Sequence, residues 1–295
     1  MQNLKPEISI VIPAHNEEKY ITRTIRSLQE QDFSGAYEII VVDNASSDAT
    51  ASVAIAAGAR VVHAAQKGVC YARQAGTEAA QSRIIVSTDA DTTFPTHWLS
   101  NIAAAFAQNE HVVAASGSFS FTPPPRWSVW FSKTIFRVVA LLFQLRETVA
   151  YAPACNFAFT AAAWRAVGGY NTKLTQGGDE YDLLRKLKKE GRVIFLPNHV
   201  VTTSSRRLQY GLLYNMIVTL GLYYIVEYLL SRLLGKSFLG GYPAYREEEI
   251  SRRTAFVRSA MVVVGLFVFW RVCSSSLEFA HAHQLGLRAL RIHRG

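Results

Sequence analysis

The sequence predicts an α/β domain in which a mostly parallel sheet is flanked by helices. Short runs rich in β-branched residues alternate with amphipathic segments through the first half of the chain, which is the signature of β-α-β units. Polar residues follow directly after those runs. The 295 residues are 49% hydrophobic, with only 18 Gly and 9 Pro. A chain of this kind can bury a substantial core, which excludes disordered and collagen-like classes.

Five runs are predicted to be strands and three segments between them to be helices. The strands cover residues 8–12, 38–42, 60–63, 83–87 and 112–115. The first helix shows apolar residues at helical spacing, namely Ile21, Ile25 and Leu28. The other two helices cover residues 69–80 and 98–108.

Residues 122–150 break this alternation. A proline-rich stop, Pro123 to Pro125, precedes an apolar, aromatic-rich stretch at helical spacing that also carries Lys133 and Arg137. One interpretation is a core helix of the same domain. The other is an interfacial helix that meets lipid or a lipid-linked acceptor. Both stay open at this point.

Residues 209–295 are predicted to form hydrophobic, basic helices that associate with a membrane. Residues 1–205 carry 19 Lys and Arg against 17 Asp and Glu, whereas residues 206–295 carry 12 against 5. The stretches 211–226 and 259–270 lack charged side chains, but they are shorter than the roughly 20 residues that cross a bilayer. We therefore expect helices that lie on anionic lipid, and no binding of nucleic acid.

The cysteines and the N-terminus predict a cytoplasmic protein at the inner face of the membrane. The three cysteines, Cys70, Cys155 and Cys273, are widely separated and show no zinc-binding spacing. This favours a reducing compartment. The apolar run near the N-terminus is too short for a secretory signal.

Polar clusters follow the predicted strands at the positions where an open α/β sheet binds its ligands. The clusters are Pro13-Ala-His-Asn-Glu-Glu18, Asp43-Asn-Ala-Ser-Ser-Asp48, Lys67-Gly68 and Thr88-Asp-Ala-Asp91. Because ligands of such sheets bind at the carboxyl ends of the strands, we expect these four clusters to form one site.

Asp89 and Asp91 are the most informative pair by mechanism. Two carboxylates separated by one residue can converge on Mg²⁺ or Mn²⁺, which take oxygen ligands and bridge phosphate oxygens. A diphosphate-bearing substrate follows from that interpretation. An isolated D-x-D is more often a solvated turn, so its context decides.

The context resembles a family 2 glycosyltransferase of the GT-A fold, over about residues 7–205. Six motifs in the family's order carry the resemblance: Ser9-Ile-Val-Ile-Pro-Ala-His-Asn-Glu-Glu18, Val41-Val-Asp-Asn-Ala-Ser-Ser-Asp48, Lys67-Gly68 with Ala72-Arg73 and Gly76, Asp89-Ala-Asp91, Val167-Gly-Gly169 and Gly178-Asp-Glu-Tyr-Asp-Leu183. The resemblance implies an inverting, metal-dependent enzyme that uses a nucleotide-sugar. Together with the composition of the tail, it divides the chain into a catalytic domain, 1–208, and the membrane-associating region, 209–295. Within the catalytic domain, about 7–118 would bind the nucleotide-sugar and about 119–208 would face the acceptor.

The resemblance also assigns residues to the donor. It places Pro13, Ala14, Asn16 and Glu17 along the nucleotide pocket, and Lys67, Gly68, Arg73, Asp89 and Ala90 against the rest of the donor. Asp89 and Asp91 would hold Mg²⁺ or Mn²⁺. Asp43 would accept a hydrogen bond from the base, such as from N3–H of uracil, which favours a UDP-sugar over a GDP-sugar. Alternatives remain: Asp43 suits a turn after a strand, and Arg73 can pair with a local acid.

The base that takes the acceptor proton is expected in the acidic pair Asp179-Glu180. The family's usual order is Glu-Asp with the second member as base, and here the order is reversed. If the register holds, Glu180 is the base and Asp179 is the competing candidate. An acidic helix start is also favoured by the helix dipole, and that role is compatible with catalysis.

The Q-x-x-R-W element of processive synthases is absent, and Ser204-Ser-Arg-Arg207 stands near its place. The arginines could meet donor diphosphate or anionic lipid, or lie on the surface. We therefore expect single additions to a hydroxyl of a glycan or lipid-linked acceptor. A polyprenyl-phosphate sugar synthase is the close alternative. A sugar-phosphate nucleotidyltransferase and a non-catalytic nucleotide-sugar binding protein are alternatives of other classes.

Overall fold

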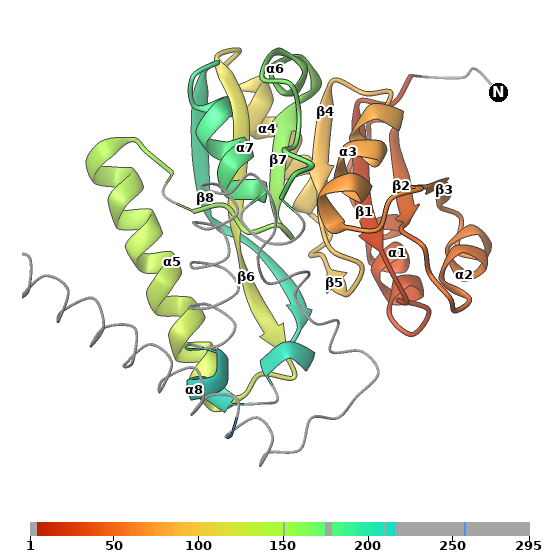
Figure 1. Ribbon diagram of the computed structural model, residues 1–295. Coiled ribbons are helices and arrows are strands. Elements are labelled where there is room, and N and C mark those ends of the chain that lie inside the picture. The colour runs from red at the N-terminus through yellow and green to blue at the C-terminus, as the bar shows by residue number, and fades with distance from the viewer. Residues whose placement is uncertain are drawn as a thin grey trace, which may run out of the picture.

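Figure 1 shows the computed structural model, which describes residues 5–149, 151–174, 179–208, 211–215, 217 and 257. The predicted membrane-associating region, 209–295, therefore lies almost entirely outside the described residues. One eight-stranded sheet organises the rest, in the order β3-β2-β1-β4-β7-β6-β8-β5. The strands are β1 (Ile8–Ala14), β2 (Tyr37–Asp43), β3 (Arg60–His63), β4 (Ile84–Ser87), β5 (Thr92–Thr93), β6 (Val112–Thr122), β7 (Phe157–Thr160) and β8 (Arg192–Ser204).

Helices flank this sheet (Figure 1). They are α1 (Ile21–Gln29), α2 (Thr50–Ala56), α3 (Val69–Ala79), α4 (Trp98–Ala107), α5 (Arg126–Arg146), α6 (Ala161–Ala166), α7 (Asp179–Leu187) and α8 (Gly211–Tyr214), with a 3-10 turn, η1, at Arg206–Leu208. All the strands and helices predicted between residues 8 and 115 are present. Their ends differ by a few residues, except that β6 continues seven residues beyond its predicted end, to Thr122.

The predicted fold class is confirmed. Strands β3, β2, β1 and β4 are parallel, and β6 and β8 are also parallel. Antiparallel pairing enters through β7, between β4 and β6, and through the two-residue β5 beside β8. The parallel half brings the ends of β1 and β2 together, since Ala14 pairs with Asp43.

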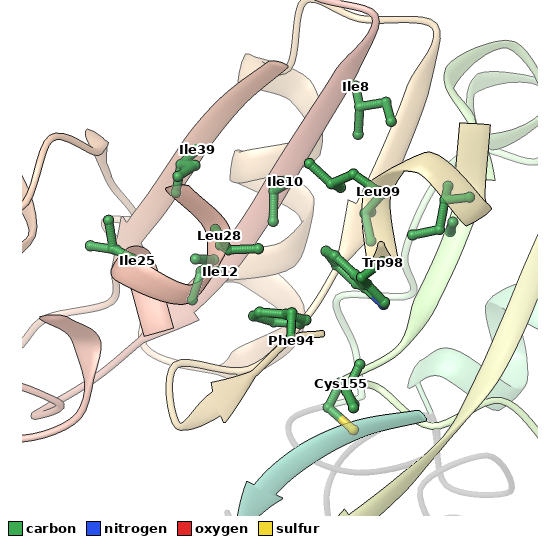
Figure 2. Packing of buried hydrophobic residues seen from close by; sticks show 14 of the residues in the cluster. Ile8, Ile10, Ile12, Ile25, Leu28, Ile39, Phe94, Trp98, Leu99 and Cys155 are labelled. Atoms are coloured by element: carbon green, nitrogen blue, oxygen red, sulfur yellow. The ribbon is translucent and has the colours of Figure 1, made fainter. Parts of the chain in front are cut away.

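The two faces of the sheet have separate hydrophobic cores because side chains alternate along each strand. Ile10 and Ile12 belong to the core that packs under α1 and α4. Val11, between them, belongs to the core on the opposite face. Figure 2 shows Trp98 of α4 among the isoleucines of the first core, next to Leu99. Trp98 is fully buried, so α4 is fixed to the sheet by its first residue.

Helix α3 lies unusually close to β1 and β2 because it contains Gly76. A Cβ atom at Gly76 would stand 2.4 Å from Cγ1 of Val11 and 2.6 Å from Cγ2 of Val42. No larger residue fits without moving the helix away. This close approach matters for function, because α3 also carries Arg73.

The stretch predicted at 122–150 forms a single long helix, α5. Phe136 and Val139 are buried against the sheet, whereas Trp130 and Leu145 are 70% and 71% exposed. Residues Trp127–Arg146 are long and apolar enough to cross a membrane by length and composition, and 22% of that window is buried. One face of α5 is therefore a core element, and another presents large apolar side chains to its surroundings.

Candidate active site

The loops after β1 and β2 are joined by hydrogen bonds at the edge of the sheet. Asn16 has a φ of 56°, a left-handed conformation that asparagine tolerates better than most residues. Its Oδ1 accepts from the backbone N–H of Ser47 at 2.8 Å, and its own N–H donates to Oγ of Ser46 at 3.1 Å. The N–H of Glu17 donates to Oγ1 of Thr50 at 2.7 Å. The two strand-end clusters thus form one rigid wall.

Asp43 lies at the end of β2, within this wall. One carboxylate oxygen accepts from the N–H of Ser46 at 3.2 Å, and the other lies 3.2 Å from Nδ1 of His63. Its side chain is 11% exposed, so it keeps an accessible edge. Asp43 therefore stabilises the turn after β2, and its role in binding the base stays a prediction.

The neighbouring Asn44 connects this wall to the start of α3. Its side chain accepts from the N–H of Gly68 at 2.6 Å and donates to the carbonyl of Gln66 at 2.6 Å. Gly68 has a φ of 142°, in the region open to glycine. The adjacent Lys67 is exposed and forms no ion pair with the residues that the structure describes.

Asp89 and Asp91 follow β4 and are held by contacts from distant segments. Oγ1 of Thr24 donates to the carbonyl of Ala90 at 2.7 Å. The backbone N–H of Ser204 donates to the carbonyl of Asp91 at 3.2 Å, and Oγ1 of Thr203 donates to its carboxylate at 3.4 Å. The side chain of Asp89 is 36% exposed. The D-x-D turn is therefore fixed in place, and the carboxylate of Asp89 stays partly exposed.

Arg73 gathers three of the predicted carboxylates around one buried guanidinium. Nη2 lies 2.9 Å from Asp89, and Nη1 lies 2.8 Å from Asp179 and 2.7 Å from Glu180. Nε donates to Oγ of Ser87 at 3.2 Å. Burial by itself would lower the pKa of Arg73, but the carboxylates, Glu180 first, raise it well above its ordinary value. Arg73 is therefore permanently charged and belongs to the acidic cluster.

The acidic pair stands at the N-terminus of α7, as its sequence predicts. The side chain of Asp179 is 2% exposed and that of Glu180 is 11% exposed. Burial raises the pKa of Glu180 well above its usual range, and the neighbouring Asp179 raises it further, while Arg73 opposes both. Glu180 is thus the more accessible member of the pair. Residues 175–178, which precede it, lie outside the described part of the chain.

Arg206 forms a second cluster, which the sequence indicated only loosely. Its guanidinium binds Glu17 with two hydrogen bonds, at 2.8 and 2.7 Å, and lies 2.9 Å from Oδ2 of Asp91. It also lies over the ring of Tyr20, 4.7 Å from the centroid. Burial tends to lower the pKa of Arg206, but Glu17 and Asp91 raise it above its ordinary value. The sequence drew attention to Arg206 through the segment Ser204-Ser-Arg-Arg207, but it did not indicate that Glu17 and Asp91 are the partners of Arg206.

A cavity of about 380 Å³ opens beside Arg206 and Asp91. Its walls come from Arg23 and Thr24 of α1, from Tyr20 directly before that helix, and from β5, the β6–α5 turn and the end of β8. The cavity is lined by Asp91, whereas the Arg73 cluster contains Asp89. A ligand at Asp89 and Asp91 would therefore lie between two arginine-centred groups.

The predicted cation site depends on the oxygen atoms of the D-x-D turn. Asp89 and Asp91 supply hard carboxylate oxygens of the type that Mg²⁺ and Mn²⁺ prefer. Within the described residues no group of three or more His, Cys, Asp or Glu side chains is arranged to hold a metal ion. The two carboxylates therefore fit a cation that completes its coordination with substrate phosphate and water, as Mg²⁺ commonly does.

The structure brings most predicted site residues to one edge of the sheet. Arg206 contacts both Glu17 and Asp91, and Arg73 contacts Asp89, Asp179 and Glu180. Pro13 and Ala14 end β1 beside the end of β2, and Ala90 is buried between the two aspartates. Their individual roles remain predictions. The side chain of Arg207 lies outside the described residues.

Comparison with known proteins gives a consistent picture. Residues 9–167 match the family model described as "Glycosyl transferase family 2". Glycosyltransferase AglE of Haloferax volcanii is 23% identical over 291 residues, which cover 92% of this chain and 93% of that protein. An undecaprenyl-phosphate 4-deoxy-4-formamido-L-arabinose transferase of Sodalis glossinidius is 30% identical over 149 residues, or 47% of this chain and 43% of that protein.

Among solved structures, the mannosyltransferase PcManGT of Pyrobaculum calidifontis, in complex with GDP-mannose and Mn²⁺, superimposes with a TM-score of 0.61 at 21% identity. The match covers 90% of this chain and 76% of that one. This likeness shows a shared fold, the GT-A fold that the motifs led us to expect. Several curated relatives are matched over less than half of their own length.

Proposed function

Because the chain belongs to glycosyl transferase family 2, we propose that it transfers a sugar, with inversion, from a nucleoside-diphosphate-sugar to an acceptor hydroxyl. Glycosyl transfer itself follows from the family. The observation that carries the finer proposal is the continuous set of contacts at one sheet edge. Arg206 ties Glu17 to Asp91, and Arg73 ties Asp89 to Glu180, so the proposed nucleotide, cation and base positions adjoin one another.

The donor is proposed to lie along the ends of β1, β2 and β4. Asp43, with one accessible edge, would accept a hydrogen bond from the base, because an ionised carboxylate can only accept. The N3–H of uracil suits that role, so we propose a UDP-sugar in preference to a GDP-sugar. The mannosyltransferase of Pyrobaculum calidifontis is in complex with GDP-mannose. A test of the donor must therefore compare UDP-sugars with a GDP-sugar.

The diphosphate is proposed to meet a divalent cation held by Asp89 and Asp91. Such a cation supplies charge stabilisation to a leaving diphosphate. Arg206 is close enough to Asp91, at 2.9 Å, to share in that stabilisation. The solved mannosyltransferase of the same fold contains Mn²⁺, which supports the choice of Mg²⁺ or Mn²⁺ as cofactor.

Glu180 is proposed as the base. As the acceptor oxygen bonds to the anomeric carbon, its proton passes to the Glu180 carboxylate, and the bond from that carbon to the diphosphate oxygen breaks with both electrons leaving on oxygen. The raised pKa of Glu180 makes its ionised form a stronger proton acceptor. Asp179 is fully enclosed at 2% exposure, which favours Glu180 as the residue that meets the acceptor.

The acceptor is proposed to be a glycan or a lipid-linked molecule at the cytosolic face of a membrane, glycosylated one sugar at a time. Helix α5 presents Trp130 and Leu145 on its exposed side together with exposed Lys133 and Arg137. Apolar and basic side chains in this mixture are typical of helices that lie in a lipid interface. Flotation with anionic vesicles should carry the protein upward, and Trp130→Ser with Leu145→Ser should weaken that association.

A polyprenyl-phosphate acceptor is the second candidate, favoured by the same apolar face of α5. An acceptor phosphate is already ionised and needs no strong base. Incubation with undecaprenyl phosphate and with soluble sugar acceptors in parallel separates the two proposals. Product on undecaprenyl phosphate in the Glu180→Gln variant would select the second candidate.

Thermal shift against a donor panel tests the donor proposal. The panel contains UDP-glucose, UDP-N-acetylglucosamine and GDP-mannose, each with Mn²⁺ and with chelator. Binding to the folded state raises apparent stability by about 2.7 kcal/mol at a hundredfold excess over Kd. We expect the largest shift with a UDP-sugar and Mn²⁺, reduced by Asp43→Ala. A shift confined to GDP-mannose would overturn the base assignment.

A further inference from the structure

We propose that Arg73 is a positioning residue that fixes the base relative to the cation-binding carboxylate, and that it is not a ligand of the donor. This inference rests on the proposed function, which places the cation at Asp89 and the base at Glu180. It replaces the donor contact suggested for Arg73 by its sequence motif.

The side chain of Arg73 is engaged by the protein itself. It is 4% exposed, and each of its three nitrogens already has a partner. Nε donates to Ser87, Nη1 to Asp179 and Nη2 to Asp89, at 3.2, 2.8 and 2.9 Å. Because the guanidinium is buried and each nitrogen already donates within the protein, little of it is available to a diphosphate.

The partners of Arg73 come from two separate parts of the fold. Asp89 follows β4, 16 residues away along the chain, whereas Asp179 begins α7, 106 residues away. Glu180, 2.7 Å from Nη1, stands on the same helix turn. Arg73 is therefore a direct polar connection between the D-x-D turn and the start of α7.

The geometry of the guanidinium makes this connection specific. Its planar fork presents donors in fixed directions, so it can hold two carboxylates on different edges at once. A lysine ammonium keeps the charge but is a single point on a flexible stem. Lysine at this position can compensate the buried carboxylates without holding Asp89 and Glu180 in one arrangement.

The backbone of α3 is placed to deliver this side chain. Gly76, one turn further along the helix, allows α3 to approach Val11 and Val42. Arg73 thereby reaches Ser87, the last residue of β4. The packing of α3 against the sheet thus places the guanidinium of Arg73 between the D-x-D turn and the start of α7.

Positioning predicts a distinctive kinetic signature. A displacement of about 1 Å of a catalytic group lowers the rate about 100-fold. Arg73→Lys should therefore lower kcat about 100-fold and leave the Kd of UDP and of GDP, measured with Mn²⁺ by calorimetry, within about twofold of the original protein. Arg165→Lys, at an exposed arginine of α6, is the matched control and should change neither quantity.

A double-substitution cycle tests whether Arg73 acts through Glu180. If it does, Arg73→Lys added to Glu180→Gln should cause little further loss, because residues that act as a unit are strongly non-additive. Arg73→Gln is the harsher variant, and circular dichroism shows whether it folds. Where it does not fold, Arg73→Lys alone decides the question.

The outcomes separate this inference from the function on which it rests. A Kd for nucleotide that rises tenfold or more, with kcat retained at saturating donor, would make Arg73 a donor ligand and overturn the inference. Unchanged kcat and Kd, or full additivity with Glu180→Gln, would overturn it too. An original protein that binds neither UDP nor GDP with Mn²⁺ would refute the proposed function, and the inference with it.

Discussion

Substitution of His199 by leucine should make the protein less sensitive to acid. His199 lies in β8 and is 4% exposed, with its ring stacked on Trp98 at 6.0 Å between centroids. Neither ring nitrogen has a hydrogen-bond partner among the described residues. Burial, and then the proximity of His97, lower the pKa of His199 from 6.5 to about 4. Leucine has a similar size and removes the group that titrates.

The sign and size of the effect follow from that pKa. Between pH 6.5 and about pH 4 the unfolded chain binds a proton at His199 that the folded protein does not. Acid therefore favours unfolding in this window. The difference between the two pKa values corresponds to about 3 kcal/mol, reached in full below pH 4. At pH 7 the contribution is absent, since both states are neutral there.

The assay is urea denaturation of the original protein and of His199→Leu in one buffer series from pH 7 to pH 4, which gives the free energy of unfolding at each pH. The stability of the original protein should fall by about 3 kcal/mol more than that of His199→Leu. His111→Leu, at an exposed histidine, controls for loss of an imidazole as such. Equal pH slopes for the original protein and His199→Leu would refute the argument that this ring is buried in its neutral form.

The remaining predictions concern packing, a buried polar network and the base. Gly76→Ala should lower stability by about 1 to 3 kcal/mol, as overpacking does, and should lower turnover, whereas a fully stable variant would contradict the close helix approach. Asn156→Ala removes hydrogen bonds to Trp98, to the carbonyl of Ser118 and to another backbone carbonyl, so the midpoint of thermal unfolding should fall by at least 5 °C. Glu180→Gln should abolish transfer to a hydroxyl acceptor with nucleotide affinity retained. The opposite ranking, with Asp179→Asn inactive and Glu180→Gln active, would make Asp179 the base.

The local parts of the fold and the site were predictable from the sequence. The runs of β-branched residues and the polar residues that follow them are patterns of neighbouring positions, so they can be recognised in one sequence. They located β1, β2 and β4 and the carboxylates Asp43, Asp89 and Asp91. The acidic start of α7 was predictable for the same reason. The family motifs then supplied the order in which those segments should appear.

The long-range contacts were not predictable, because one sequence does not encode which distant side chains meet. Arg206 binds Glu17 across 189 positions, and Arg73 binds Asp179 across 106. The antiparallel strands β5 and β7 were not predicted from the sequence either. Strand β5 has only two residues, too few for a periodic pattern, and β7 has four, ending directly in α6.

One measurement tests the central claim most directly, namely nucleotide release from a nucleotide-sugar in the presence of Mn²⁺ and acceptor. The proposed site predicts release of a nucleoside diphosphate together with a glycosylated product, lost on chelation and lost in Asp91→Ala. Pyrophosphate released when a nucleoside triphosphate and a sugar 1-phosphate are supplied in place of the nucleotide-sugar would instead indicate a sugar-phosphate nucleotidyltransferase. Binding without any turnover, or turnover that persists in Asp91→Ala and in chelator, would contradict the proposed cation-dependent transfer.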